Sequence, residues 1–388
     1  MILDENKADI IQNAIHKLLD LVLNGAYLSN KSKIIYPLNR TIHHNVWSQI
    51  SQLKKILRTQ FDQICSDDLY DVLSCLVRYK NQNFNLNEKE SSKKIIVISR
   101  VFEEKSYDEI SIKPVKGLAN YVKDKLKDCL YDAYIHGSLS TKDYTGYSDF
   151  DTLFIIKDSQ LIDPDNIKKL EKLFIRSKRF LYELDPLQHH GHFFLLEADL
   201  KYYNQSFLPL SALKLSTSLL GKGTNLKIHV RHSAEESQER FIESIRLIRR
   251  YITADRQRLQ YPYYLKGFLS HFMILPALFL QTNGHFVTKK DSFDILKYQI
   301  PGQIWQCMEK VSLIRRNWKQ ESYKGQRELI KIIGLWNPLL LPLYAKYFYK
   351  CHPVDESIIN NELLNEMYMF ANNLIRLSGI DEKRFEIE

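Results

Sequence analysis

Between residues 115 and 200, apolar runs of strand length alternate with segments of helical periodicity, and this alternation limits the possible folds more than any other feature. The expected elements are a helix at 115–130, strands at 131–136 and 150–157, a helix at 164–183 and a strand at 192–198. Strands that alternate with helices are typical of a small α/β unit. Because the helix at 164–183 forms a crossover, the strands on either side of it should run parallel.

Helical periodicity dominates on both sides of this unit. Residues 1–80 repeat apolar positions at intervals of three and four, as in ADIIQNAIHKLLDLVL, and the polar stretch 81–94 predicts a linker or exposed loop. Beyond about residue 205 the pattern is helical and broken by prolines, with no convincing strand. We therefore predict an α+β protein with an N-terminal helical region at 1–90, an α/β core with a small mixed sheet at 91–204 and a C-terminal all-helical domain at 205–388.

The net charge of +9 over 388 residues favours an anionic partner, such as a nucleotide, with RNA as a further possibility. The five cysteines are widely spaced without a Cys-x-x-Cys pair, which argues against a disulfide framework or a zinc knuckle. The N-terminal residues lack the pattern of a secretory signal. The most apolar window, 268–280, is short and contains Ser, His and Pro, so it predicts a buried helix rather than a membrane span. We expect a cytoplasmic protein without a membrane partner.

The loop between the first two predicted strands carries the clearest chemistry. It lies within IHGSLSTKDYTGYSDFD, with Gly137 and Ser138 after one strand and Asp149 and Asp151 at the start of the next. Both pairs should therefore share one edge of the sheet, and the two aspartates should point to the same face. Paired carboxylates suit Mg²⁺, because water and phosphate oxygens normally complete the coordination of this ion. A glycine lets the backbone approach a phosphate closely. A β-hairpin loop with ordinary turn residues is the alternative interpretation.

This stretch resembles the nucleotidyltransferase superfamily related to DNA polymerase β, whose signature is Gly-Ser after a strand and then Asp-x-Asp at the start of the next. The Ser-Asp-x-Asp spelling that begins at Ser148 is similar to that of antibiotic-modifying and other small-molecule members. The resemblance covers residues 130–200. It implies a nucleotidyltransferase core that moves NMP from an NTP to an acceptor hydroxyl and releases pyrophosphate. By this resemblance Gly137, Ser138 and Ser148 bind the nucleotide, and Asp149 and Asp151 hold Mg²⁺ or Mn²⁺.

Members of that superfamily usually carry a third carboxylate on a later strand. Glu197 and Asp199 are candidates, but a strand parallel to the Asp-x-Asp strand should present its ligand near its start, and Glu197 lies roughly 16 Å beyond His192 at ~3.3 Å per residue. The start of this strand carries His189, His190 and His192 instead. We therefore expect His192, or His190 on the same face, to complete the site as a ligand or general base. Glu197 and Asp199 stay as alternatives, as does a polar turn without a functional histidine.

Lysines and arginines of the C-terminal half are further candidate site residues. The segment HFVTKKDSFDIL looks like the helical domain that covers the nucleotide in small-molecule nucleotidyltransferases, so Lys290 or its neighbour Lys289 is expected to meet the triphosphate. A solvated helix start is the alternative. Arginines on amphipathic segments are candidates for an anionic groove or for solvated helix faces: Arg246, Arg249, Arg250, Arg315 and Arg316.

The acceptor stays open between a small molecule, a tRNA and a protein. A hypothesis of a different class is a catalytically idle nucleotide-sensing protein, or a toxin-antitoxin or defence component, that retains the fold. Histidines in place of a third carboxylate favour this second hypothesis.

Overall fold

The computed structural model describes residues 5–25, 68–83, 93–221, 223–231, 233–318, 324–348 and 358–386. It belongs to the α+β class, with 65% helix and 12% strand, as predicted. The helical pattern at 46–67 and most of the predicted linker at 81–94 lie outside the described residues.

A five-stranded sheet forms the centre of the protein, and its strands lie in the order β2-β7-β3-β4-β5. β3 is antiparallel to β4, and β4 is parallel to β5, with Leu153 opposite Phe193. The predicted parallel pair is therefore confirmed, and α7 (Pro164–Leu184) makes the crossover between its strands. The strands span Arg100–Val101 (β2), Thr217–Ser218 (β7), Leu130–Ile135 (β3), Thr152–Ile156 (β4) and Phe193–Leu196 (β5).

A second, three-stranded sheet has the order β1-β8-β6. Its strands are Lys93–Ile98 (β1), Thr224–Arg231 (β8) and Tyr203–Asn204 (β6). The expectation of no strand beyond 205 is thus wrong for both β7 and β8. β8 alternates buried Leu226, Ile228 and Val230 with more exposed polar residues, and its antiparallel partner β1 lies far away in sequence. The α/β part therefore extends to Arg231 rather than ending at 204.

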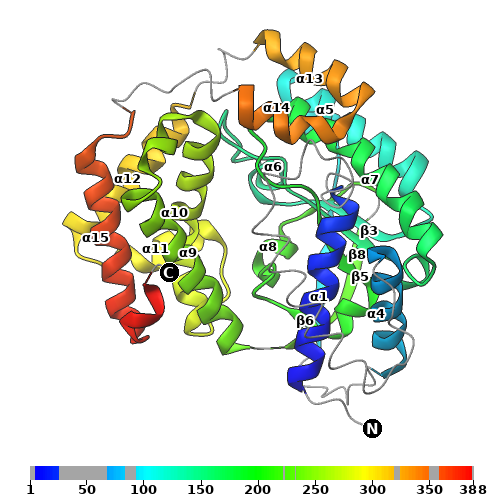
Figure 1. Ribbon diagram of the computed structural model, residues 1–388, viewed down its shortest axis with the longest axis horizontal. Coiled ribbons are helices and arrows are strands. Elements are labelled where there is room, and N and C mark those ends of the chain that lie inside the picture. Colours follow the sequence, from blue (N-terminus) through cyan, green and yellow to red (C-terminus); the bar gives the residue numbers. More distant parts are fainter. Residues whose placement is uncertain are drawn as a thin grey trace.

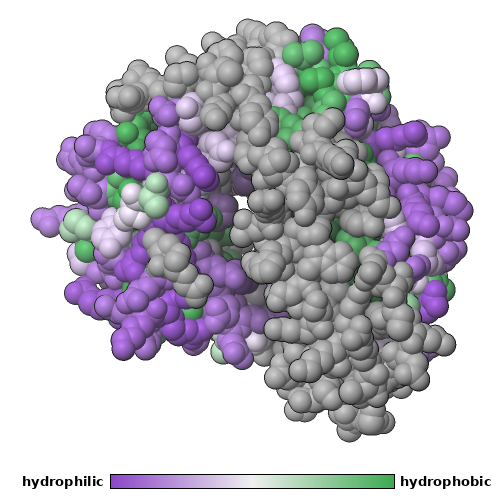
Figure 2. Space-filling view, viewed as in Figure 1, coloured by the Kyte–Doolittle hydropathy of each residue, from purple (hydrophilic) through white to green (hydrophobic). Residues whose placement is uncertain are grey.

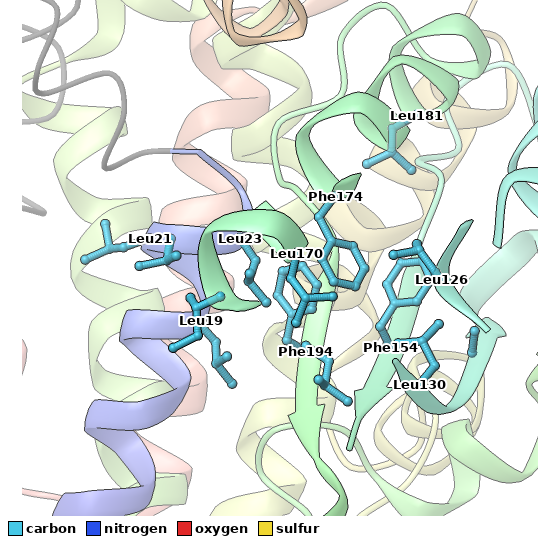
Figure 3. Packing of buried hydrophobic residues seen from close by; sticks show 14 of the residues in the cluster. Leu19, Leu21, Leu23, Leu126, Leu130, Phe154, Leu170, Phe174, Leu181 and Phe194 are labelled. Carbon is cyan, nitrogen blue, oxygen red and sulfur yellow. The ribbon is translucent and has the colours of Figure 1, made fainter. Parts of the chain in front are cut away.

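The hydrophobic core between the five-stranded sheet and its helices contains aromatic rings from three elements. α7 begins after Asp163, whose side chain caps the backbone N–H of Asp165, and it buries Phe174 completely. The Phe174 ring lies 5.1 Å from that of Phe154 on β4 and 4.9 Å from that of Phe194 on β5. Figure 3 shows these rings together, with leucines of α1 on their other side. Burying each such ring contributes about 1.5–3 kcal/mol.

The helices near the N-terminus belong to the same core. α1 (Glu5–Leu23) contacts α4 (Leu69–Asn83), α7 and β5, and α5 (Glu109–Tyr121) packs on α7. Their apolar side chains join those of the sheet in one buried cluster. The predicted N-terminal helical region is therefore part of the α/β unit in the described residues. We call this unit, with α13 and α14 described below, the core lobe.

A second group of helices forms what we call the helical lobe, with its own buried cluster (Figure 1). Its helices are α9 (Ala234–Thr253), α10 (Pro262–Thr282), α11 (Lys289–Leu296), α12 (Gly302–Arg316) and α15 (Asn361–Ser378). α10 is long and apolar enough to cross a membrane by length and composition, but 67% of its most apolar window is buried inside the protein. It is therefore the core helix of this lobe, as predicted for 268–280.

Two helices of the C-terminal half return to the core lobe. α13 (Lys324–Trp336) packs on α7, and α14 (Leu341–Phe348) follows it, so both lie apart from α12 and α15 in Figure 1. α13 turns four apolar residues outward, and Figure 2 shows hydrophobic surface in this area, whereas the helical lobe is mostly hydrophilic on the same face. The four residues are Leu329, Ile332, Leu335 and Trp336. The region predicted as one C-terminal domain is thus divided between the two lobes.

Candidate active site

The Gly-Ser turn lies directly against Asp151. β3 ends at Ile135, and the short helix α6 (Gly137–Thr141) begins at Gly137, whose φ of +68° favours glycine. A Cβ atom at Gly137 would lie 2.4 Å from Asp151 Oδ2, so a side chain at this position would displace the carboxylate. The backbone N–H of His136 also donates to the carbonyl of Asp151 at 3.1 Å. The structure therefore brings the two halves of the sequence motif into contact.

Asp149 and Asp151 lie in the loop just before β4, not within the strand as predicted. Their side chains are 15% and 24% exposed, whereas Phe150 between them is fully buried in the core. The Phe150 backbone N–H donates to Gln188 Oε1 at 3.1 Å, which ties this loop to the loop before β5. Because buried Phe150 alternates with the two partly exposed aspartates, both carboxylates lie on the same side, as the period of two predicted.

Lys266 of α10 reaches across from the helical lobe to Asp149. Its Nζ atom lies 2.7 Å from Asp149 Oδ1 and also pairs with the carboxylate of Asp185, at the end of α7. Lys266 is fully buried, and the two carboxylates keep its pKa above the ordinary value although burial opposes this. Burial raises the pKa of Asp185 to about 7, with Lys266 opposing and Asp149 adding to the rise. The pKa of Asp149 stays well below its usual range, because Lys266 and His189 outweigh its burial.

His189 and His190 face the aspartates from the loop between α7 and β5. The distance from His190 Nε2 to Asp151 Oδ1 is 3.1 Å, and that from His189 Nδ1 to Asp149 Oδ1 is 3.5 Å. Burial disfavours a charge on His190, but the nearby aspartates, Asp151 above all, outweigh it and raise the pKa of His190 to about 9. At neutral pH His190 is therefore an imidazolium that neutralises Asp151, just as Lys266 neutralises Asp149.

The turn that carries these histidines is held by Asn24, which follows α1. Asn24 Nδ2 donates to the carbonyl of His192 at 3.0 Å, and the His192 backbone N–H donates to Asn24 Oδ1 at 3.0 Å. A Cβ atom at Gly191 would lie 2.0 Å from Asn24 Oδ1, so only glycine leaves room for this pair of hydrogen bonds. The N-terminal helix thereby fixes the position of His190, which immediately precedes Gly191.

His192 does not complete the site, contrary to the sequence prediction. His192 is 2% exposed and its ring meets that of Phe154 edge to face, while Nδ1 bonds to Thr152 Oγ1 at 2.7 Å and Nε2 bonds to Ser177 Oγ at 2.8 Å. Burial lowers the pKa of His192 well below its ordinary value. His192 is thus a neutral core histidine with both nitrogens occupied. Of the predicted residues, His190 is the one that reaches the aspartates, together with His189.

The alternative carboxylates lie at the other end of β5. Asp199 is fully buried in η6 (Glu197–Lys201) and pairs with Lys80 and with His16 Nε2, the latter at 2.8 Å. Glu197, at the start of the same turn, is exposed. Neither residue therefore supplies the expected third ligand. Sequence reasoning missed Asp185 and Lys266; the one signal for Lys266 was a single lysine within the apolar helix α10.

Lys289 and Arg315 bring further positive charge to the site from the helical lobe. Lys289 is exposed at the start of α11, but many protein atoms surround it. Their desolvation of the ammonium group, together with Arg315, lowers the pKa of Lys289 to about 8, while Asp151 and Asp149 oppose this. The Arg315 guanidinium lies 4.5 Å from the centre of the Tyr147 ring. Tyr147 in turn donates to the Lys266 carbonyl, which joins the Asp-x-Asp loop to α10. The structure thus brings Lys289 into range of the carboxylates, one residue before the predicted Lys290.

The two predicted serines differ in their surroundings. Ser148 Oγ accepts a hydrogen bond from the Thr145 backbone N–H at 2.9 Å, and the Ser148 N–H donates to the Thr145 carbonyl, so Ser148 closes a turn in the loop before Asp149. Ser138 is half-buried in the first turn of α6, next to Gly137. Ser138 therefore directly follows the glycine that lies against Asp151.

The donor groups fit a divalent cation. Asp149, His189 and His190 each offer a ligand atom, and these atoms lie within 4.8 Å of one another. Asp151 adds a further carboxylate beside His190. Burial lowers the pKa of His136, although Asp151 opposes this, so that His136 is a neutral imidazole. The site therefore combines carboxylate oxygens with imidazole nitrogens, a donor set that binds divalent metals.

Comparisons of the chain with protein-family models, curated proteins and solved structures gave no match. Function must therefore be inferred from the geometry and chemistry of the site itself.

Proposed function

We propose that the protein is a metal-dependent nucleotidyltransferase, which transfers NMP from an NTP to an acceptor hydroxyl and releases pyrophosphate. The observation that carries this proposal is the contact between the Gly137 backbone and Asp151, with Asp149 two residues earlier on the same side. A phosphate that approaches the Gly-Ser turn would meet both carboxylates at once. The order β3-α6-β4-α7-β5, with β4 and β5 parallel, supports the resemblance to the superfamily related to DNA polymerase β.

The residues around the motif have complementary roles in this proposal. Asp149 and Asp151 would hold a divalent cation, which neutralises the charge that develops on the phosphates. Gly137 permits close approach of the triphosphate, and Ser138 donates a hydroxyl hydrogen bond to it. Lys289 and Arg315 supply positive charge from the helical lobe, opposite the carboxylates. His189 and His190 take the place that the sequence assigned to His192.

The acceptor is a small molecule, a tRNA or a protein, and the net charge of +9 keeps RNA among these. A cytoplasmic location, where NTPs are abundant, accords with the proposal. Incubation with each labelled NTP, a divalent metal and a cell extract would show whether the label enters RNA, protein or a small molecule.

The test of the reaction uses Asp149→Asn and Asp151→Asn. We expect each to reduce metal-dependent pyrophosphate release from NTPs by at least about 100-fold, because the preorganised charge at the phosphates is lost. Asp165→Asn is the matched control: this carboxylate is 76% exposed at the opposite end of α7 and should leave turnover unchanged. Unchanged turnover in both active-site variants would exclude the proposed reaction.

A second candidate is a catalytically idle nucleotide-sensing protein, or a toxin-antitoxin or defence component. The observation that favours it is that Lys266 and the His190 imidazolium already neutralise both aspartates. This candidate predicts NTP binding in calorimetry without pyrophosphate release in Mg²⁺ or Mn²⁺. Release with any NTP would exclude it.

A further inference from the structure

The proposed site contains more imidazole than a magnesium site calls for. Mg²⁺ prefers oxygen ligands and retains waters, whereas imidazole nitrogen is a common ligand of transition-metal dications. Ligand atoms of Asp149, His189 and His190 lie within 4.8 Å of one another, and Asp151 Oδ1 is 3.1 Å from His190 Nε2. We infer that the cation of this site is a first-row transition-metal dication of the Mn²⁺ class, selected over Mg²⁺ by His189 and His190.

The hydrogen bonds of His190 support its role as a ligand. Its Nδ1 atom lies 2.9 Å from the Gly191 carbonyl oxygen, and since a carbonyl only accepts, Nδ1 must carry the hydrogen. Loss of the other ring proton would then leave a lone pair on Nε2, the atom that faces Asp151. A ligating histidine typically donates its second ring N–H to a backbone carbonyl or carboxylate in this way, which fixes both tautomer and orientation.

The backbone around His190 is also held in place before any metal binds. Asn24 makes two hydrogen bonds to the backbone of His192, and the Phe150 N–H donates to Gln188 Oε1. These contacts attach the histidine turn to α1 on one side and to the Asp-x-Asp loop on the other. The imidazoles and carboxylates therefore keep their spacing without relying on the ion itself.

The mixed donor set suits Mn²⁺, which takes oxygen ligands as Mg²⁺ does and also accepts imidazole nitrogen. Carboxylate, water and phosphate oxygens suit Mg²⁺ and Mn²⁺ alike, and imidazole adds affinity for the transition metal. A site of two carboxylates and two imidazoles keeps the chemistry that phosphate binding needs while it discriminates against Mg²⁺. This inference rests on the proposed function only in assigning the metal to the nucleotide site.

The test measures binding of the metal alone to the full-length protein. Mn²⁺ is titrated and followed by electron paramagnetic resonance, and Mg²⁺ is then added as competitor, without nucleotide. We expect Mn²⁺ to bind at least about 10-fold more tightly than Mg²⁺. His189→Gln and His190→Gln should each weaken Mn²⁺ binding about 10- to 100-fold and change Mg²⁺ binding by less than about threefold, since amide oxygen replaces imidazole nitrogen.

His285→Gln is the matched control, because His285 is an exposed histidine in the helical lobe, and it should leave both affinities unchanged. Circular dichroism of both active-site variants checks that they fold. Equal affinities for Mn²⁺ and Mg²⁺ in the parent protein would overturn the inference, as would a preference for Mn²⁺ that persists in both folded variants. Selective Mn²⁺ binding without pyrophosphate release from any NTP would contradict the proposed reaction and leave the metal assignment standing. Pyrophosphate release with equal metal affinities would do the reverse.

Discussion

The strand pair β4–β5 has a cluster of charged residues at each end. The two clusters differ in how far their carboxylates are buried and hydrogen-bonded. At one end Asp199 is fully buried and accepts from Lys80, His16, Gln12 and the Leu196 backbone N–H. At the other end Asp149 and Asp151 keep 15% and 24% of their side-chain surface open. A sealed and fully paired carboxylate serves the fold, because it holds helices to the sheet. The open pair keeps lone pairs that a ligand can use.

The two clusters also draw their cations from different parts of the protein. Lys80 belongs to α4, within the core lobe, whereas Lys266 belongs to α10, in the helical lobe. The sealed cluster therefore joins elements that already share one hydrophobic core. The open cluster joins two separately packed lobes, so its charges depend on how the lobes meet.

The largest expected effect comes from breaking the sealed cluster. Asp199→Ala should lower the free energy of unfolding by about 3–5 kcal/mol, because it removes the carboxylate that Lys80 and His16 share in the interior. Asp151→Ala should cost less, since its carboxylate is 24% exposed and water can replace part of its interactions. Urea denaturation of both variants gives the comparison. Equal losses would show that the two clusters do not differ as described.

A smaller effect is expected from crowding the histidine turn. Gly191→Ala should lower the free energy of unfolding by about 1–3 kcal/mol, because the new Cβ atom must push the Asn24 side chain away from its two hydrogen bonds. The NMR signals of His190 should shift, while those of the Asp199 cluster stay in place.

Gly267→Ala is the control for this change. Gly267 lies within α10 and a Cβ atom there would meet nothing within 4 Å, so alanine should stabilise the protein by about 0.5–1 kcal/mol. A loss of stability in Gly267→Ala, or none in Gly191→Ala, would contradict the packing of the two sites.

The dependence of stability on pH sharpens the comparison without a substitution. His190 has a pKa of about 9, above the ordinary value near 6.5, so its pairing contributes full stability below about pH 6.5 and is lost as the pH rises through 9. Although burial opposes it, Lys80 and His16 hold the pKa of Asp199 below its usual value. The stability from Asp199 is therefore present above about pH 4 and lost only as the pH falls further.

NMR titration of the histidine ring protons measures this difference. In Asp151→Asn the pKa of His190 should fall toward its ordinary value, because the amide carries no charge. A pKa of His190 that stays near 9 in this variant would mean that Asp151 is not its main partner.

The strand-helix-strand order at 131–196 could be predicted from the sequence because each element shows its own period. The contact of Gly137 with Asp151 also followed, since adjacent antiparallel strands place their ends together. β8 was missed although Leu226, Ile228 and Val230 alternate, because its partner β1 lies about 130 residues earlier. Local pattern carries no information about so distant a pairing.

The histidine prediction failed for a related reason. A period of two along β5 could not show that Thr152 and Ser177 occupy both nitrogens of His192. His189 and His190 reach the aspartates because the turn bends at Gly191, where Asn24 holds it. Lys266 meets Asp149 only through packing of the two lobes, and Asp185 joins them from the end of α7. Each missed contact joins residues that are remote in sequence.

The return of α13 and α14 to the core lobe has a mechanical consequence. Among the described elements, the chain passes from one lobe to the other three times: after β8, between α12 and α13, and between α14 and α15. A single proteolytic cut therefore cannot release either lobe as a separate fragment. The ion pair between Lys266 and Asp149 therefore joins two lobes that the chain itself already connects more than once.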